Sequence, residues 1–167
     1  MKTVIVYYSL DGNTRKAAES LAKAIEADIC EILPVKPLVS AGKPTFRTLM
    51  QGGGQVTFRL CPKLREFRVN LADYDRIILG TPVWAGKCAS PVYSFLKKYC
   101  PKHGLSERIT AAFTLSGSGD NAGCVRQLQK LLPRVRDTVS LADGSSPLAQ
   151  ENSARLERFA EQIRDEP

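Results

Sequence analysis

The sequence has few of the residues from which reactive or cross-linked sites are usually built. It contains one histidine, His103, and five cysteines, and no two cysteines form a C-x-x-C pair. This odd number and wide spacing fit neither a disulfide framework nor a zinc site, so we expect free thiols in a reducing cytosol. His103 falls in the turn-like stretch PKHG, where a solvated loop histidine is expected.

Long apolar runs are also missing. No stretch approaches the roughly 20 apolar residues of a membrane span. The apolar start of the chain is short and ends at Asp11-Gly12-Asn13 without a cleavage pattern, so it does not resemble a signal peptide. We therefore expect no membrane span and a cytoplasmic location. The 167 residues, 43% of them hydrophobic, suit a single globular domain over residues 1–167.

Negative charge is scarce in one segment, residues 34–70, which we call the basic insert. Its only acid is Glu66, and it supplies six of the seven net positive charges of the chain. The basic residues of this insert are Lys36, Lys43, Arg47, Arg59, Lys63, Arg65 and Arg68. A basic segment suits an anionic partner, but its phenylalanines are not regularly interleaved with the charges, which argues against nucleic acid.

Apolar β-branched runs alternate with segments of helical periodicity along the rest of the chain. The runs predict five strands, over residues 3–8, 28–33, 76–81, 109–115 and 137–141. The periodic segments predict helices over residues 13–27, 91–99, 122–132 and 152–164, and a short helix is expected over 61–69. Such alternation predicts a parallel sheet covered by helices on both faces.

Ligands of open parallel sheets bind at the carboxyl ends of the strands, so we considered the loops after strands one, three and four. The first loop, SLDGNT, combines hydroxyl groups, Gly12 and the start of a helix. Unpaired backbone N–H groups and the helix dipole can bind an anion there without a lysine. An ordinary strand-to-helix turn with a helix cap would have the same composition.

The other two loops complete a site for a flat ring with a phosphate tail. The second presents the only tryptophan, Trp84, between Pro82 and Gly86, and its loop position favours an indole face open to a planar ligand over an indole folded into the core. The third, SGSGDN, offers many donors, although a plain turn with Asp120 or Asn121 as a helix cap would look alike.

Three segments, YYSLDGNTRKAA, YDRIILGTPVWAGK and FTLSGSGDN, make the chain similar to the flavodoxin-like family of FMN proteins. The resemblance spans most of the chain and is poorest over the basic insert. It implies an α/β three-layer sandwich with a five-stranded parallel sheet of order 2-1-3-4-5, and FMN at the switch between strands one and three. The FMN-binding residues that it implies are Ser9, Asp11, Gly12, Asn13 and Thr14 at the phosphate, Pro82, Val83, Trp84, Ala85 and Gly86 on one side of the ring, and Ser116, Gly117, Ser118, Gly119 and Asp120 on the other.

The chain departs from the family pattern in three ways. Asp11 stands where the family usually has Thr or Ser, and a carboxylate about 5 Å from a phosphate charge would cost roughly 3 kcal/mol at an effective dielectric of about 20. Either Asp11 braces the loop through backbone N–H groups, which we favour, or it weakens phosphate binding; Arg15 could offset its charge. In addition, SGSGDN lacks the aromatic that often covers the second ring face, and the chain is basic where carrier flavodoxins are typically acidic.

These observations favour an FMN-dependent oxidoreductase that passes electrons or hydride from NAD(P)H to a quinone-like or other small acceptor. The cofactor would carry the redox chemistry, so no catalytic residue and no metal ligand is nominated. One alternative is a protein-to-protein electron carrier whose basic insert faces an acidic redox partner. Another is a flavodoxin-like binding module without FMN. A homodimer is a further expectation, since many flavodoxin-like reductases dimerise.

Overall fold

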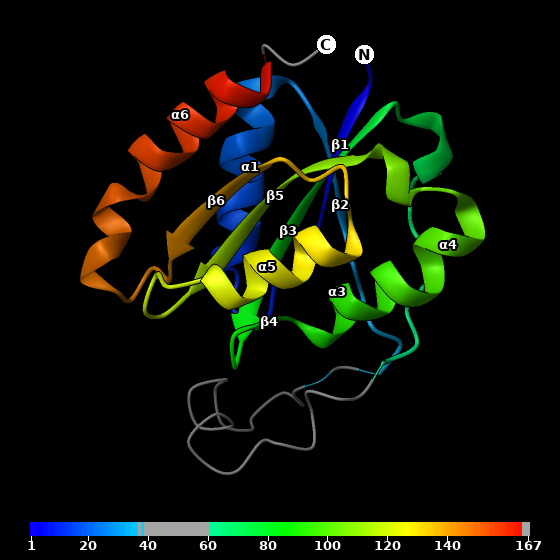
Figure 1. Cartoon of the computed structure of the whole chain (residues 1–167), viewed down its shortest axis with the longest axis horizontal. Coiled ribbons are helices and arrows are strands. Elements are labelled where there is room, and N and C mark those ends of the chain that lie inside the picture. The colour runs from blue at the N-terminus through cyan, green and yellow to red at the C-terminus, as the bar shows by residue number, and fades with distance from the viewer. Residues whose placement is uncertain (37, 39–60, 165–167) are drawn as a thin grey trace.

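A five-stranded parallel sheet forms the middle of three layers in the computed structural model, which describes residues 1–36, 38 and 61–164 (Figure 1). Its strands are β1 (Thr3–Tyr7), β2 (Asp28–Glu31), β3 (Arg76–Trp84), β5 (Ile109–Ser116) and β6 (Asp137–Ala142). They lie in the order β2-β1-β3-β5-β6, with every neighbouring pair parallel. The predicted order 2-1-3-4-5 is confirmed, because the short β4 (Lys87–Cys88) only pairs antiparallel with the end of β3.

Helices cover both faces of the sheet (Figure 1). One face carries α1 (Asn13–Ile25) and α6 (Asn152–Arg164), and the other carries α3 (Ser90–Ser94), η3 (Phe95–Tyr99), α4 (Cys100–His103) and α5 (Ala122–Leu131). Three short 3-10 turns are η2 (Leu71–Asp73), η4 (Ser106–Arg108) and η5 (Pro147–Glu151). Because successive strand residues point to opposite faces, Val4 and Val6 join one hydrophobic cluster while Ile5 and Tyr7 join the other.

The helix expected over residues 91–99 is longer than predicted. It begins at Ser90 and continues through a π-helical turn, η3, to His103. The Cys100 N–H donates to the Phe95 carbonyl, and the following Pro101 has no N–H to donate, so the widened turn precedes a proline. His103 is exposed, as predicted, but it ends a helix and its ring stacks on Tyr99 at 4.2 Å between centroids.

The short helix predicted over residues 61–69 is wrong. Residues on either side of the basic insert pair instead, with the Val35 N–H donating to the Lys63 carbonyl and the Arg65 N–H to the Leu33 carbonyl, both at 2.8 Å. Leu64 also bridges to Pro34, so pairing with the chain before the insert holds these residues extended in place of a helical turn. Of the insert's basic residues, Lys43, Arg47 and Arg59 lie outside the described residues.

β3 is also longer than predicted, and it turns the expected loop over residues 81–87 into a β-hairpin. Val83 pairs with Cys88, and Trp84 pairs with Lys87. Ala85 and Gly86 have φ values of 46° and 73°, the left-handed pair that a tight two-residue hairpin requires. The other predicted strands and helices agree with the structure to within two residues at each end.

Neither a membrane span nor a metal site is found in the part of the chain that the structure describes. Its helices are all too short or too polar to cross a bilayer. Within the same ranges, no three His, Cys, Asp or Glu side chains gather where they could hold a metal ion. All five cysteines are described, and all are free thiols.

Gly80 lies at the tightest point of the sheet, and its replacement tests this packing. A Cβ at Gly80 would lie 2.3 Å from Cζ of Phe113 and 2.8 Å from Cβ of Tyr7, both of which are buried. Overpacking of this kind typically costs about 1–3 kcal/mol. We therefore expect Gly80→Ala to lower the free energy of unfolding, measured by urea denaturation, by about that amount.

Gly117→Ala provides the matched control, because nothing lies within 4 Å of a Cβ at that position. It should leave the free energy of unfolding of the flavin-free protein within about 0.5 kcal/mol of the parent value. Equal stability of Gly80→Ala and the parent would contradict the packing described for the centre of the sheet.

Candidate functional site

The carboxyl ends of β1, β3, β5 and β6 meet around one small cavity of about 40 Å³, which we call the strand-end cavity. These ends lie at the lower edge of the sheet in Figure 1, beside β4. The lining residues are Leu10, Asp11, Asn13, Thr14, Pro82, Val83, Trp84, Leu115, Ser116, Gly117 and Asp143. The structure therefore brings together the three loops that the sequence singled out. The other predicted site residues, Ser9, Gly12, Ala85, Gly86, Ser118, Gly119 and Asp120, flank this lining in the same loops.

The loop between β1 and α1 is organised by Ser9. Its Oγ accepts hydrogen bonds from the Gly12 N–H at 3.1 Å and the Arg15 N–H at 3.2 Å. Gly12, with φ of 92°, turns the chain into α1, and a Cβ there would meet nothing within 4 Å. Ser9 thus satisfies the N–H groups of Gly12 and Arg15 and leaves open space beside Gly12. The loop can cap the helix and also bind an anion. The Ser9 oxygen accepts from two backbone N–H groups, and the same hydroxyl can still donate its own hydrogen to a ligand.

Asp11 braces this loop, as the sequence led us to expect. Its Oδ1 accepts a hydrogen bond from the Asn13 N–H at 3.1 Å. Arg15, in contrast, is not available to offset the Asp11 charge. Its guanidinium binds both carboxylate oxygens of Glu31 at 2.8 Å, and this ion pair and a hydrogen bond to Tyr7 raise the pKa of Arg15. Asp11 therefore stands beside the cavity without a compensating side-chain cation from Arg15.

The prediction that the Trp84 indole is exposed in a loop is wrong. The side chain is only 3% exposed, and its ring meets the ring of Tyr8 edge-on, at 5.8 Å and 88°. The cause is the extension of β3, which places Trp84 in a strand with its side chain in the core under α3 and α5. Burial also raises the pKa of Tyr8 well above its ordinary value, so the phenol stays protonated at neutral pH. Contact of Trp84 with a ligand stays a prediction, supported by its place in the cavity lining.

The hairpin that carries Trp84 is held against the start of α5. The Gly86 carbonyl oxygen lies 2.9 Å from the position of a Cβ on Gly123, and the Cys88 N–H donates to Gln127 Oε1 at 2.9 Å. Burial raises the pKa of the Cys88 thiol to about 12, and it raises that of Cys124 as well. Both thiols stay protonated at neutral pH, so neither is a nucleophile for the neighbouring site.

The loop between β5 and α5 presents hydroxyl groups and caps its helix at the same time. The hydroxyls of Ser116 and Ser118 are 3.3 Å apart, and the Asp120 carboxylate accepts from the Ala122 N–H at the start of α5. Gly119 turns the loop with a φ of 71°. Asn121 is buried and donates from Nδ2 to the carbonyls of Thr114 and Leu141, which fixes the loop to β5 and β6.

Asp143 is the functional candidate that the sequence analysis missed. It follows β6, whose loop was not considered, and its Oδ1 accepts from Asn13 Nδ2 at 2.9 Å and from the Ser145 N–H at 3.1 Å. The Asn13 amide, predicted to face a phosphate, is thus directed toward the loop after β6. Applying the strand-end rule to the fifth strand would have identified the stretch ADGSS.

A larger cavity of about 560 Å³ lies in the groove between α1 and α6. It shares Asn13 and Leu115 with the strand-end cavity, and its floor is formed by apolar residues such as Leu21 and Leu156. The side chain of Arg164 crosses one end of the groove and donates to the Ala24 carbonyl. Because this groove runs along two helices and away from the strand ends, its size alone does not make it the better candidate site.

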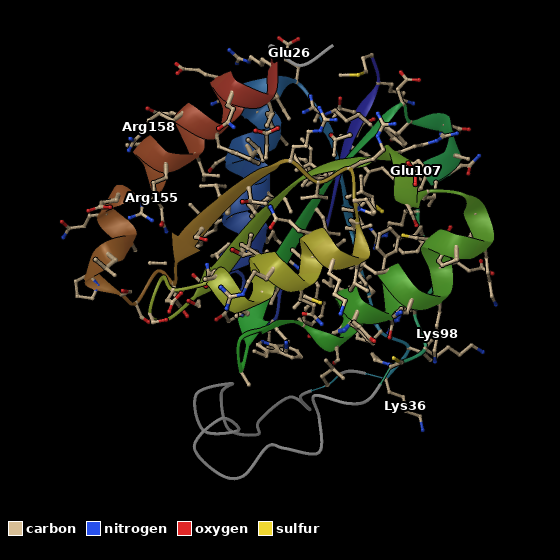
Figure 2. The ribbon with its side chains drawn as sticks, in the orientation of Figure 1. Glu26, Lys36, Lys98, Glu107, Arg155 and Arg158 are labelled. Atoms are coloured by element: carbon tan, nitrogen blue, oxygen red, sulfur yellow. The ribbon has the colours of Figure 1, made fainter. Side chains whose placement is uncertain are left out.

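Exposed lysine and arginine side chains surround the stem of the basic insert. Lys36, Lys63, Arg65 and Arg68 are exposed on the stem itself. Lys98 of η3 donates from Nζ to the Cys61 carbonyl at 3.4 Å, so the helical layer adds to this charge; Lys36 and Lys98 are labelled in Figure 2. The stem follows directly from β2, where the Ile32 N–H donates to the Tyr7 carbonyl. The stem's cluster of cations therefore begins at the same edge of the sheet as the strand-end cavity.

Comparison with known proteins agrees with this arrangement. A flavoprotein of Bacteroides eggerthii superposes with a TM-score of 0.72 at 21% identity, covering 99% of both chains. A flavoprotein of Lactobacillus acidophilus in complex with FMN superposes with a TM-score of 0.56 at 23% identity, covering 86% of this chain and 94% of that one. Among curated proteins, an NAD(P)H dehydrogenase (quinone) of Methylocella silvestris is 30% identical over 121 residues, which are 68% of this chain and 55% of that protein.

The family itself follows from a match to most of the chain. Residues 2–151 match the family model described as flavodoxin. This match includes the loops after β1, β3, β5 and β6 and the basic insert. The chain therefore belongs to the flavodoxin family, as the motifs at its strand ends predicted.

Proposed function

We propose that this chain is an FMN-dependent oxidoreductase that takes hydride from NAD(P)H and reduces a quinone-like or other small acceptor. The observation that carries the proposal is the convergence of the loops after β1, β3 and β5 on one cavity. The likeness to an NAD(P)H dehydrogenase (quinone) supports the choice of donor and acceptor. Since the chain spans 55% of that protein's length, the activity of the whole relative is a proposal here.

The residues at the strand ends fit a flavin phosphate in chemistry. Hydroxyl groups of Ser9, Thr14 and Ser116 surround the start of α1, whose N-terminus favours an anion. The backbone has open space beside Gly12 and Gly117, where a Cβ would touch nothing within 4 Å. The cavity itself holds little more than one water, so only a phosphate oxygen would enter it and the ring would lie over the loops outside.

When bound, FMN supplies the hydride chemistry, and the protein's part is to hold and orient it. The loop after β1 would hold the phosphate through its backbone and hydroxyl donors. The hairpin at Pro82–Gly86 and the loop at Ser116–Asp120 would flank the ring, and both are held firmly, the first against α5 and the second through Asn121. This arrangement requires no nucleophile or general acid from the protein.

An accessible ring supports a small acceptor. The loop after β5 consists of small and polar residues and contains no aromatic that could cover one ring face. The only tryptophan nearby, Trp84, is buried against Tyr8 instead of projecting from its hairpin. A nicotinamide and then a quinone could therefore approach the same face in turn.

Anaerobic reduction by a nicotinamide tests this function. The FMN-loaded protein should lose its visible flavin absorption when NADH or NADPH is added without oxygen, and a subsequent addition of benzoquinone should restore it. A flavin that stays oxidised with both nucleotides would contradict the proposal. Colourless protein that takes up no added FMN would instead favour a binding module without the cofactor.

The basic surface around the insert stem supports a second candidate, an electron carrier for an acidic redox protein. Exposed Lys63 and Lys98 belong to it, with Glu66 as the one acid of the stem. Complementary charge of this kind speeds association and is weakened by salt.

Charge reversal distinguishes this candidate from the first. For a carrier, the double variant Lys63→Glu with Lys98→Glu should slow electron transfer to an acidic ferredoxin-type protein by more than about tenfold at low ionic strength, and little at high ionic strength. The control, Lys16→Glu with Lys23→Glu on α1, should change the rate far less. Equal rates for the two double variants, or a flavin that never stabilises a semiquinone on stepwise reduction, would rule against the carrier.

A further inference from the structure

The strand-end cavity has an unusual balance of charge for a phosphate site. Two carboxylates line it, Asp11 from the loop after β1 and Asp143 from the loop after β6. Among the described residues, none of those lining the cavity is a lysine or an arginine. An anion that enters therefore meets hydroxyl and backbone donors together with two negative charges.

Both carboxylates are oriented by hydrogen bonds. Asp11 Oδ1 accepts from the Asn13 N–H. Asp143 Oδ1 accepts from the Asn13 side chain, the Ser145 N–H and the Ser145 hydroxyl. These bonds tie the two carboxylates to the same residue, Asn13, at the start of α1.

The two cations in the first turn of α1 do not line the cavity. Arg15 is paired with Glu31 on β2, and Lys16 lines the groove between α1 and α6 instead of the strand-end cavity. β3 contributes Pro82, Val83 and Trp84, and the end of β5 with the residue after it contributes Leu115, Ser116 and Gly117, none of which is charged. Lys87, opposite Trp84 in the hairpin, is exposed and does not line the cavity. Within the described ranges, the compensation at the cavity itself is the positive end of the α1 dipole, equivalent to roughly half a charge.

A phosphate monoester changes charge within the physiological range, because its second pKa is about 6. No histidine lines the cavity, since His103 stacks on Tyr99 at the end of α4. The group that titrates near pH 6 at this site is therefore the ligand's phosphate.

We propose that the strand-end cavity selects the monoanionic form of the FMN phosphate, with Asp11 and Asp143 as the residues that determine this preference. The proposal rests on FMN as the cofactor but on neither the donor nor the acceptor proposed above. A protonated phosphate brings one charge fewer against the two carboxylates, and its O–H can donate a hydrogen bond to one of them. FMN affinity should then fall as pH rises through the second phosphate pKa.

Flavin titration at several pH values tests the proposal without any redox partner. The dissociation constants of FMN and riboflavin are measured by fluorescence between pH 5.5 and pH 8. For FMN the constant should rise at least about tenfold over this range, since the monoanion becomes the minor form. For riboflavin, which lacks the phosphate, it should stay within about twofold.

Two single variants on different loops identify the residues responsible. Asp143→Asn and Asp11→Asn each keep an oxygen that can accept from Asn13 but remove one charge. Each should bind FMN more tightly than the parent at pH 8 and should flatten the rise of the dissociation constant to below about threefold. Glu107→Gln, on η4 away from the strand-end cavity (Figure 2), makes the same charge change and should behave as the parent does.

Three results would overturn the proposal. These are an FMN dissociation constant that is constant or falls as pH rises, an equal rise for riboflavin, and folded Asp143→Asn and Asp11→Asn variants that both keep the parent's pH dependence. Because no nicotinamide or quinone is present, failure of the proposed oxidoreductase function would leave these measurements unaffected.

Discussion

Parallel pairing of β1 with β3 is the constraint on which the rest of the structure depends. The two strands run in register from Thr3 opposite Arg76 to Tyr7 opposite Gly80. From this central pair the chain leaves in opposite directions, to β2 on one side and to β5 and β6 on the other. The loops that follow β1 and β3 consequently diverge, and a crevice opens between them at the carboxyl edge of the sheet. Gly80 permits the close approach, since the positions around it are filled by Phe113 and Tyr7.

Most of this framework could be predicted from the sequence because its signals are local. Buried strands appear as β-branched runs, and α1 and α6 as periodic apolar positions, so the elements and the three loops followed from the pattern. The sheet order followed from the resemblance to the flavodoxin-like family. The predictions failed where distant pairings decide the structure. Trp84 was expected in a loop, but pairing with Lys87 extends β3 and buries it. Leu64 was expected in a helix, but it bridges to Pro34 across the base of the insert.

Asp143 shows the same limitation within the site itself. It lies 130 residues from Asn13 in the sequence, and no local pattern reveals that the two side chains bond. Only the pairing of β6 with β5 brings its loop to the strand-end cavity. The structure also separates charges of opposite sign. The chain is basic overall, yet the charges that line the cavity are acidic, while the stem of the insert carries four exposed cations, Lys36, Lys63, Arg65 and Arg68.

We propose that flavin binds at the strand ends and not in the larger groove between α1 and α6. Hydrogen–deuterium exchange with and without FMN tests it most directly. FMN should slow exchange in residues 9–14, 82–86 and 116–120, and leave α6 (Asn152–Arg164) unchanged. Slower exchange in α6 with no change in the three loops would contradict binding at the strand ends and would place the flavin in the groove.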